Sequence, residues 1–544
     1  MSYRGMSSSA IALSDVSKLR SGNENDVQVS SIATAHSLPG WVTPLSYRVV
    51  RHTERLAALS ILAISFATMV FGLADEGLWL DEAYGHDMAL LPWREMARIT
   101  RDDAHPPLYY AILSLVVPLF GSTECGLRFP SVISAVFAVP FAHAIGHRVD
   151  GRRGAFAAAM AVGFSPFLQY YAREVRMYAP LVAVACAATY GLLRLVERPT
   201  RLPVAFYAAT VATLLYTHYF GSLLIAAHGG ALAVAALRRR ISRTTLLLWS
   251  LALVAAGILF LPWALGIVTR LGAYAGGAAT GTPRLRILVE AATGFAIGFP
   301  PHQLDQLAGS SRAMLFQYAA PLVLVALAIV GAWPRRAPGT GIARTIGPSV
   351  LAWAAAFPPI AVALVFGERQ EIAPRYLAVA VAPLAILAAL GALRLFERSR
   401  GLGTLSGGAL LAISAIAIIT FHRDARVWRD DFRSLASFIA DNARPGQIVV
   451  ANAGYIHRPL RYYLGDRWPI AQIAPRSADI AQQTEAIARS APFVWLAIFQ
   501  EYYADPEASA RVWLDAHASP RVERRFRGNL RLIGYSTERP SADD

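Results

Sequence analysis

Charge and cysteine are both scarce in this sequence. Only 16% of the 544 residues are charged and 55% are hydrophobic, whereas about a quarter of the residues in a typical soluble domain are charged. The two cysteines, Cys125 and Cys186, are too few for a disulfide framework. Cys186 lies inside an apolar run, where it is expected to serve as a small packing residue. A fold held together by several disulfides is therefore excluded.

Charge is missing altogether from several long runs. Leu251–Leu265 and Ala409–Phe421 contain no charged residue, and the mean hydropathy of the chain is +0.40. A helix needs about 20 apolar residues to cross the hydrocarbon core of a bilayer. One buried helix of a soluble protein could look like this, but a whole series of such runs predicts an integral membrane protein with many spans.

The positive charge has a preferred location. A formal net charge of +15 would suggest a nucleic-acid partner for a soluble protein. Most arginines, however, flank apolar runs and cluster in alternate short loops, which is where the positive-inside rule applies. We therefore expect no nucleic-acid partner, and we place these loops in the cytoplasm. They contain Arg148, Arg152, Arg153, Arg198, Arg201, Arg238, Arg239, Arg240, Arg243, Arg335, Arg336, Arg344, Arg398 and Arg400.

The first 54 residues are polar and lack the charged-then-apolar pattern of a cleavable signal. Arg48, Arg51 and Arg55 precede the first apolar run. We therefore expect residues 1–54 to be a disordered cytoplasmic tail. The setting predicted for the whole chain is a bacterial inner (plasma) membrane.

The transmembrane domain is expected over residues 55–421. Its first loop, residues 75–128, mixes carboxylates, histidines, prolines and aromatic residues, which a spanning helix does not tolerate. Within it, Pro107–Gly121 is apolar but short, so we expect a helix that lies in the interface or re-enters the membrane. Counting it as a span would place all the arginine clusters outside. The eleven predicted spans are 56–74, 129–146, 154–171, 177–195, 203–218, 221–237, 245–267, 314–333, 348–366, 375–395 and 403–421.

Beyond Phe421 the sequence becomes charged and amphipathic. Phe432–Asn442 and Ile480–Arg489 have helical periodicity, and they alternate with short apolar runs typical of strands. We expect residues 422–544 to form a small α/β domain, which an odd number of spans places outside the cytoplasm. The predicted strands are Gln447–Ala451, Phe493–Phe499 and Leu530–Tyr535.

Two adjacent carboxylates, Asp81 and Glu82, open the first outer loop. Asp81 could act as a general base toward an acceptor hydroxyl, or the pair could hold a divalent cation. No other cofactor is indicated. Alternatively, the segment is only the solvated start of a loop, since Trp79 and Tyr84 are typical residues of the membrane interface.

Four further outer segments add polar groups. The double proline after His105 fixes its position, as contact with a phosphate would require, although such a histidine is also common on surfaces. An arginine at a helix mouth can grip a phosphate with its forked guanidinium, or pair with a nearby glutamate. The candidate substrate-binding residues are His105, Arg173, Glu174, His218, Tyr219, Arg375 and Tyr376.

Several catalytic motifs are missing from the sequence. It has no glycine-rich nucleotide motif and no Ser–His or oxyanion-hole signal. Arginines for a phosphate, a carboxylate for an attacking hydroxyl and apolar surface for a lipid tail instead suit a reaction on a lipid-borne anionic substrate. A lipid-linked saccharide transporter or flippase is the alternative, although repeated halves and mid-span polar residues do not stand out. A non-catalytic envelope scaffold would leave the acidic first loop unexplained.

A family resemblance rests on four segments, taken in their order relative to the spans. In that order they resemble the GT-C membrane glycosyltransferases, most closely the branch with protein O-mannosyltransferases and lipid A aminoarabinose transferases. The likeness covers roughly residues 70–425. The segments are Trp79-Leu80-Asp81-Glu82, His105-Pro106-Pro107-Leu108, Leu127-Arg128-Phe129-Pro130-Ser131 and Arg375-Tyr376-Leu377.

The resemblance implies inverting transfer of a sugar from a polyprenyl-phosphate donor to an acceptor protein, lipid or glycan at the outer membrane face. It implies that Asp81 is the catalytic base, with Glu82 beside it. Glu174 matches a second acidic position, where many members have aspartate. Arg375 would hold the donor phosphate, and His105 lies in a matching segment.

Overall fold

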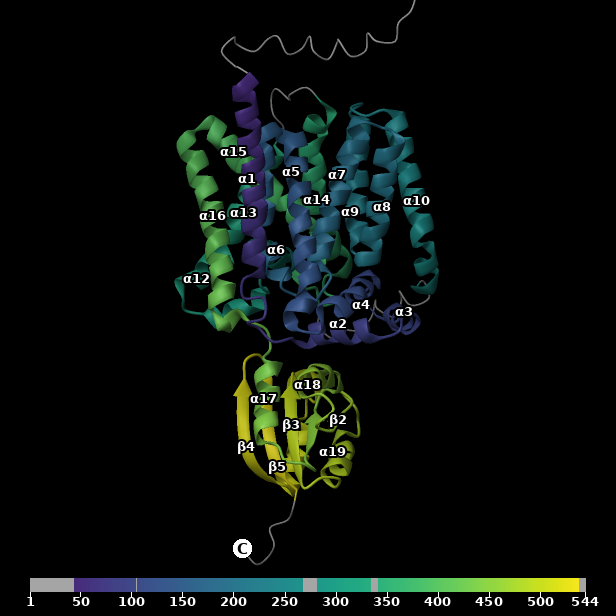
Figure 1. Ribbon diagram of the computed structural model, residues 1–544, viewed down its shortest axis with the longest axis vertical. Helices are drawn as coiled ribbons and strands as arrows, with labels where there is room; N and C mark the ends of the chain where they lie inside the picture. The colour runs from purple at the N-terminus through teal and green to yellow at the C-terminus, as the bar shows by residue number, and fades with distance from the viewer. Residues whose placement is uncertain (1–43, 104, 268–280, 334–340, 538–544) are drawn as a thin grey trace, which may run out of the picture. The chain divides into compact units, whose positions relative to one another are not determined.

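The structure is a computed structural model that describes residues 44–103, 105–267, 281–333, 341–537. It divides into two units, residues 1–57 and 58–544. Apart from the start of the first helix, the features described below belong to the second unit. Most of the predicted tail, residues 1–43, lies outside the described residues. Figure 1 shows the chain as a ribbon.

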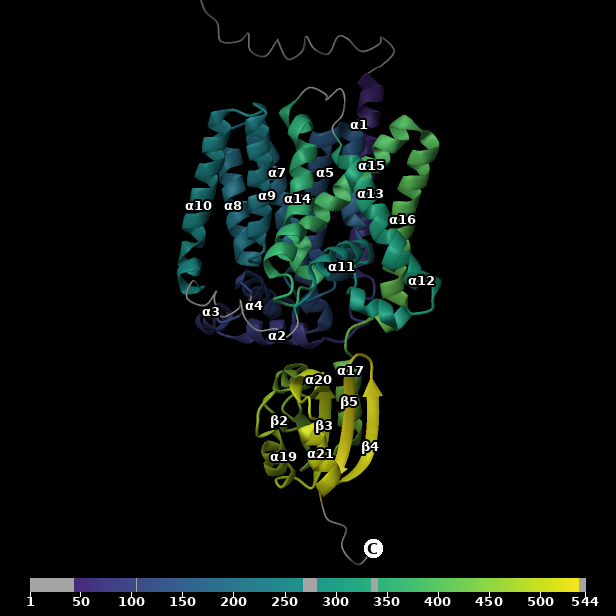
Figure 2. The same ribbon diagram turned by 180° about the vertical axis from the view of Figure 1, so that it is seen from behind.

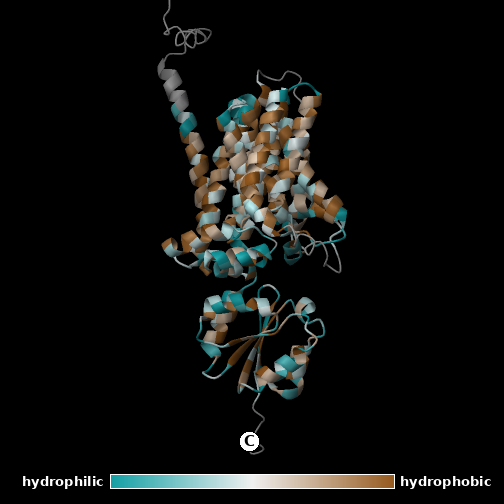
Figure 3. Ribbon diagram, turned by 90° about the vertical axis from the view of Figure 1, so that its right-hand side faces the viewer, coloured by the Kyte–Doolittle hydropathy of each residue, from teal (hydrophilic) through white to brown (hydrophobic). Residues whose placement is uncertain are grey.

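Apolar helices make up most of the second unit. Eight helical stretches within the described residues are long and apolar enough to cross a membrane, and Figure 3 shows apolar residues prevailing along them. The prediction of an integral, multi-pass membrane protein is confirmed. The helices that cover the predicted spans are α1 (Pro44–Val70), α5 (Glu124–Gly163), α6 (Pro166–Tyr171), α7 (Tyr178–Glu197), α8 (Arg201–Thr217), α9 (Gly221–Leu237), α10 (Arg243–Ile267), α12 (Ser311–Met314), the π-helix η4 (Leu315–Ala319), α13 (Ala320–Ala332), α14 (Ile342–Phe366), the 3-10 helix η5 (Pro374–Ala380), α15 (Val381–Arg398) and α16 (Arg400–Arg423).

The exact count of eleven spans is not confirmed. Helix α5 holds two predicted spans, because its 40 residues reverse direction at Gly151, where φ is +70°. A Cβ on Gly146 would lie 2.2 Å from the carbonyl oxygen of Gly154, so the two arms pack backbone to backbone. Helices α8 and α9, with 17 residues each, are short for a span by the usual length.

The first loop folds into three short helices, α2 (Leu80–Leu90), α3 (Trp93–Arg101) and α4 (Leu108–Phe120). Figure 1 shows them gathered at one end of the membrane helices. With 13 residues, α4 is about 20 Å long at 1.5 Å per residue, too short for a hydrocarbon core of about 30 Å. The expected short helix is therefore present, and its interfacial placement stays a prediction.

Two elements were not anticipated by the sequence patterns. Helix α11 (Arg284–Ile297) and the 3-10 helix η3 (Pro301–Leu307) lie between α10 and α12. Figure 2 shows α11 near the end of the helical part where α2–α4 lie. The η3 segment brings His302 and Gln303 to the candidate site.

The C-terminal residues form the expected α/β fold. The sheet order is β2-β1-β3-β5-β4; β1 pairs in parallel with β2 and β3, whereas β5 is antiparallel to β3 and β4. The elements are the 3-10 helix η6 (Ala425–Val427), α17 (Phe432–Asn442), β1 (Ile448–Ala451), the 3-10 helix η7 (Gly454–Ile456), α18 (His457–Leu464), β2 (Ile470–Gln472), α19 (Ile480–Ala488), β3 (Phe493–Phe499), α20 (Glu501–Ala504), α21 (Ser509–His517), β4 (Ser519–Phe526) and β5 (Leu530–Ser536).

Both faces of this sheet are covered. One apolar cluster joins α17 and α18 to side chains such as Val449 and Trp495. A second cluster joins α19 and α21 to the alternate strand residues, including Val450 and Leu496. This alternation is expected of strands buried on both sides. All three predicted strands are present as β1, β3 and β5, whereas β2 and β4 were missed.

Candidate functional site

The adjacent carboxylates at the start of α2 have different surroundings. The side chain of Asp81 is 26% exposed, whereas Glu82 is fully buried. Successive positions on a helix point about 100° apart, because one turn takes 3.6 residues. The two side chains therefore point into different surroundings, although they are neighbours in the sequence.

Both oxygens of Glu82 are occupied. Arg128 donates from Nε to Oε1 at 2.8 Å and from Nη2 to Oε2 at 2.7 Å, and the Val175 N–H donates to Oε1 at 3.0 Å. A paired, hydrogen-bonded carboxylate suits a buried site. This geometry does not favour the predicted catalytic role of Glu82, nor its chelation of a cation with Asp81, because Glu82 instead ties α2 to α5.

Asp81 faces two arginines. Its Oδ2 lies 3.8 Å from Nη2 of Arg375 and 4.0 Å from Nε of Arg176. Both distances are too long for hydrogen bonds but short enough for strong attraction between opposite charges. Asp81 and Arg375, which were predicted as separate site residues, are thus brought together from segments almost 300 residues apart in the sequence.

Arg375 is held by aromatic rings. Its guanidinium carbon lies 5.4 Å from the ring centre of Tyr376, 5.7 Å from Trp79 and 5.9 Å from Tyr178. Its Nε also donates a hydrogen bond of 3.2 Å to the hydroxyl of Tyr178. Cation–π contacts of this kind orient a guanidinium without consuming its N–H donors. The Nη groups can therefore still bind an anion.

Arg176 is a functional candidate that the sequence predictions omitted. It donates from Nη1 to the Tyr110 hydroxyl at 3.2 Å and lies 3.4 Å from Nε2 of His105 through Nη2. Its Nε is buried and has no hydrogen-bond partner among the described residues. The one signal for Arg176 in the sequence was its position two residues after Glu174, a predicted site residue.

His105 and His218 both lie close to Arg176. Their ring centres are 5.7 Å apart, and that of His218 is 6.1 Å from Tyr376. Burial and the charge of Arg176 lower the pKa of His105, against the opposing effect of Asp103. The neutral form of His105 therefore prevails near pH 7, which makes it a hydrogen-bonding group rather than a cation.

Arg173 and Tyr219 are not brought to Asp81 by any described contact. Arg173 donates to the carbonyl of Gly72 and contacts Nδ1 of His422 at 2.9 Å. The hydroxyl of Tyr219 accepts a hydrogen bond of 3.1 Å from the indole of Trp263. Both contacts join helices or helix ends. This geometry therefore does not support the predicted substrate contacts of Arg173 and Tyr219.

Glu174 lies in a polar cavity that shares Arg375 with Asp81. The cavity has a volume of about 600 Å³ and extends to His302 in η3 and to the β4–β5 turn. Glu174 is 3.9 Å from Arg429. Burial raises the pKa of Glu174 to about 7, although Arg429 and Arg375 oppose the shift. The C-terminal part of this wall was missed, because no sequence pattern links it to the first loop.

The first loop and the C-terminal fold are joined by several polar contacts. Glu76 pairs with Arg429 at 3.3 Å, and Asp87 pairs with Arg458 at 2.9 Å. The hydroxyl of Tyr463 accepts a hydrogen bond of 2.6 Å from the N–H of Leu78. The segment that leads into Asp81 is therefore held by Arg429 and Tyr463, which lie 353 and 385 positions after their partners in the sequence.

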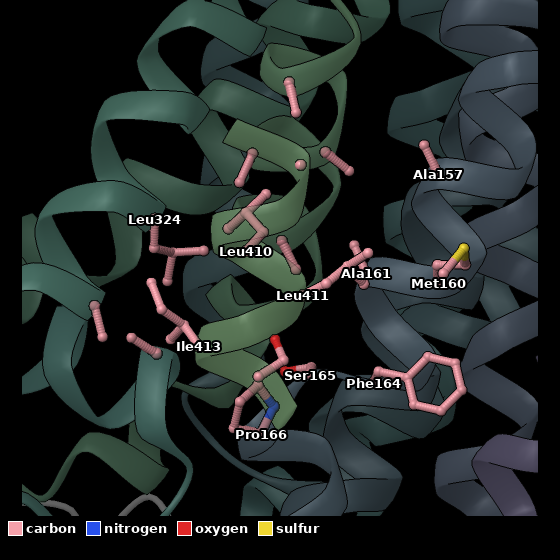
Figure 4. Close-up of a pocket in the computed structure, with 18 of the residues that line it drawn as sticks. Ala157, Met160, Ala161, Phe164, Ser165, Pro166, Leu324, Leu410, Leu411 and Ile413 are labelled. Carbon is pink, nitrogen blue, oxygen red and sulfur yellow. The ribbon is translucent and has the colours of Figure 1, made fainter. Parts of the chain in front are cut away.

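A second cavity is apolar. It measures about 230 Å³ and is lined by residues of α5, α11, α13, α15 and α16, including Met160, Leu324 and Leu410. Figure 4 shows these side chains around the space. Val381, which begins α15 six residues after Arg375, also lines it. Its chemistry suits a hydrocarbon chain.

The possible divalent cation receives no support from the residues that the structure describes, since no group of three or more His, Cys, Asp or Glu side chains there could hold a metal ion.

Comparisons with known proteins bear on the fold and on one part of the sequence. Residues 104–265 match the family model described as dolichyl-phosphate-mannose-protein mannosyltransferase. No curated protein matches the chain by sequence.

Solved structures match over nearly the whole chain. ArnT from Cupriavidus metallidurans in the apo state has a TM-score of 0.57 and 14% identity, covering 88% of this chain and 97% of that one. The same protein bound to undecaprenyl phosphate scores 0.55 with 14% identity, over 89% and 98% of the two chains. An oligosaccharyltransferase from Archaeoglobus fulgidus scores 0.52 with 13% identity, over 88% and 73%. The chain therefore has the fold of the GT-C glycosyltransferases and, in residues 104–265, resembles the dolichyl-phosphate-mannose-protein mannosyltransferases.

Proposed function

We propose that the protein is an inverting glycosyltransferase that moves a sugar from a polyprenyl-phosphate carrier to an acceptor hydroxyl. The observation that carries the proposal is the position of Asp81, a partly exposed carboxylate that faces Arg176 and Arg375 without hydrogen-bonding to either. A base must be accessible to the proton that it removes, whereas a phosphate needs cations. Both requirements are met within 4 Å of one oxygen atom.

In the proposed reaction, Asp81 takes the proton of the acceptor hydroxyl, and the oxygen of that hydroxyl forms a bond to the anomeric carbon of the donor. The bond from that carbon to the phosphate oxygen breaks, and the polyprenyl phosphate leaves. Arg375 and Arg176 stabilise the negative charge on the departing phosphate. A single displacement inverts the configuration and requires one carboxylate, which agrees with the occupied oxygens of Glu82.

Two observations support a lipid carrier. The similar protein ArnT has been solved bound to undecaprenyl phosphate, and the apolar cavity of this chain begins within a few residues of Arg375. In this proposal, prenyl units occupy that cavity while the phosphate lies at Arg375. His105, His218 and Tyr376 would complete the wall around the transferred sugar.

The proposed orientation puts this site on the outer face of the membrane and the N-terminus inside. Arg148 pairs with Glu197 at 3.2 Å, and Gly151 lies close to Arg344. Turns rich in arginine thus meet at one end of the bundle, whereas His105, His218 and Arg375 meet at the other. The positive-inside rule favours the arginine end for the cytoplasm of a bacterial inner membrane.

Replacing Asp81 with asparagine tests the mechanism. We expect Asp81→Asn to lower transfer of a labelled sugar from polyprenyl phosphate to membrane acceptors by about 10²–10⁴-fold, because the base is lost with little change in volume. Asp102→Asn, at an exposed aspartate in the same loop, is the control and should retain transfer. Both variants should melt as the unaltered protein does. Near-normal transfer by Asp81→Asn would refute the mechanism.

A further inference from the structure

The polar cavity between Arg375 and the β4–β5 turn presents an unusual set of polar atoms. Among the described residues, Nε1 of Trp79, Oε1 of Gln303, Oε2 of Glu174 and Nη2 of Arg429 are buried without a hydrogen-bond partner. All four side chains line this one cavity. A buried polar atom without a partner destabilises the folded protein, so a cluster of such atoms points to a ligand or to ordered water.

The four atoms include donors and acceptors. The indole and guanidinium N–H groups donate, whereas the amide oxygen accepts and the carboxyl of Glu174 can do either. The nearest opposite charges in this set, Glu174 and Arg429, remain 3.9 Å apart. A ligand that both donates and accepts at each of its groups fits this mixture, and hydroxyl groups have that property.

Aromatic rings complete the wall. Trp79, Tyr170, Tyr171, Trp428 and Phe526 all line the cavity. Rings offer an apolar surface to the C–H face of a ligand, while polar groups between them fix its orientation. A ring with hydroxyl groups around its edge and C–H groups on its faces is a sugar ring.

Apart from Arg375, which the proposed function assigns to the donor phosphate, the arginines of the cavity do not favour a polyanion. Arg426 pairs with Asp424 at 2.8 Å, and Arg429 pairs with Glu76 at 3.3 Å. Arg527 lies 3.5 Å from Asp431. Their charges are therefore largely compensated within the protein, which suits a neutral ligand better than a phosphate-rich one.

We infer that this cavity is the acceptor site and that it binds the neutral sugar units of a glycan, so that the acceptor of the reaction is a carbohydrate hydroxyl. The inference rests on the proposed function for the identity of the reaction. Arg375 lies in the wall of the cavity and beside Asp81, so a sugar bound there has one end near the base. The β4–β5 turn, which closes the cavity at Gly528 and Asn529, gives the C-terminal fold a role in acceptor choice.

The experiment measures saccharide binding by the full-length protein in nanodiscs without any donor. The probes are mannobiose, maltose, cellobiose and lactose, and their binding is measured by saturation-transfer NMR. An octapeptide that contains serine and threonine serves as the competitor. We expect at least one disaccharide to bind saturably. Gln303→Leu, which removes one unpartnered acceptor at similar volume, should raise its Kd about fivefold, the value of one hydrogen bond near 1 kcal/mol.

The matched control is Gln482→Leu on α19, an exposed glutamine of the C-terminal fold outside the cavity. It should leave the Kd unchanged. Equal effects of the two variants, no binding of any disaccharide, or binding of the peptide instead would overturn the inference. Asp81→Asn separates the two proposals, because it should bind the disaccharide and fail in transfer. Sugar transfer by a protein that binds no disaccharide would be consistent with the proposed function and would refute the inference that the acceptor is a glycan.

Discussion

The carboxyl group of Glu174 is a buried titratable group in the wall of the polar cavity. It is 1% exposed, and the carboxylates of Glu82 and Asp81 add to the effect of burial, whereas Arg429 and Arg375 oppose it. The pKa of Glu174 is raised from 4.5 to about 7. The folded protein therefore binds this proton more tightly than the unfolded chain does, and stability must depend on pH between these values.

The sign of that dependence is fixed. Between about pH 4.5 and pH 7 the folded state holds more protons than the unfolded state, so the free energy of unfolding falls as pH rises through this window. The loss is on the order of 3 kcal/mol for a shift of this size. We expect Glu174→Gln to remove this fall. The melting temperature of the variant should therefore be higher, relative to that of the unaltered protein, at pH 8 than at pH 5.

Glu507→Gln, at an exposed glutamate, is the control for this measurement and should leave the pH profile of the melting temperature as it is. Thermal unfolding in one detergent at four pH values suffices. A Glu174→Gln profile parallel to that of the unaltered protein would show that this carboxyl does not titrate between pH 4.5 and 7.

Some residue roles could be predicted from the sequence, and others could not. Asp81 and Arg375 were identified because carboxylates and arginines at helix mouths are costly without a partner. The sequence does not show whether Arg173 or Arg176 faces Asp81. Residues 172–177 form no regular helix, so no periodicity indicates the direction of their side chains. Likewise, no pattern shows that Arg128 occupies both oxygens of Glu82.

At the scale of elements, the segment before α2 is fixed from two sides. Arg128 donates hydrogen bonds to the carbonyls of Leu73, Glu76 and Gly77. From the other side, Tyr463 of α18 accepts from Leu78 N–H and donates to Glu124 at 3.1 Å. Because Asp81 follows three residues later, the position of the proposed base depends on α18.

We expect Tyr463→Phe to lower kcat with little change in the KM for the donor, because the base moves while the phosphate contacts remain. The free energy of unfolding should fall by about 1–3 kcal/mol through the loss of the two partly buried hydrogen bonds of the hydroxyl. The kcat and KM of sugar transfer, measured together with chemical denaturation, test both effects.

The neighbouring tyrosine offers a matched control. Tyr462 donates a hydrogen bond of 2.5 Å to the carbonyl of Ser122, just before α5, and does not contact the segment that leads into Asp81 through its hydroxyl. Tyr462→Phe should therefore lower stability while kcat is maintained. If both variants changed kcat equally, α18 would support the fold in general rather than the base.

Long, strongly apolar or strongly periodic elements were predictable, whereas irregular ones were not. The spans, α4, α17 and the three buried strands carry clear hydrophobic patterns. Helix α11 escaped because it is only moderately apolar and ends at a glycine with φ of +90°, and β4 escaped because it is charged and largely exposed. The polar cavity could not be predicted, because its wall combines six segments distant in the sequence.

At the scale of the whole molecule, the distribution of charge separates two ends of the helical bundle. Short turns with several arginines form one end, and the acidic first loop with the candidate site forms the other. Free energy of insertion favours retention of such arginine clusters in the cytoplasm. The orientation proposed on this basis determines whether the protein binds donor and acceptor at the outer face of the membrane or at the cytoplasmic face.

The natural cysteines allow a direct test of this orientation. Cys125, near the start of α5 at the end where the site lies, is exposed, whereas Cys186 is buried. We expect a membrane-impermeant maleimide to label Cys125 in intact cells and to give no signal with Cys125→Ser. With Arg240→Cys added to Cys125→Ser, in a turn at the opposite end, labelling should require permeabilised membranes. Labelling of Arg240→Cys in intact cells, with Cys125 protected, would invert the topology and move the proposed reaction to the cytoplasmic face.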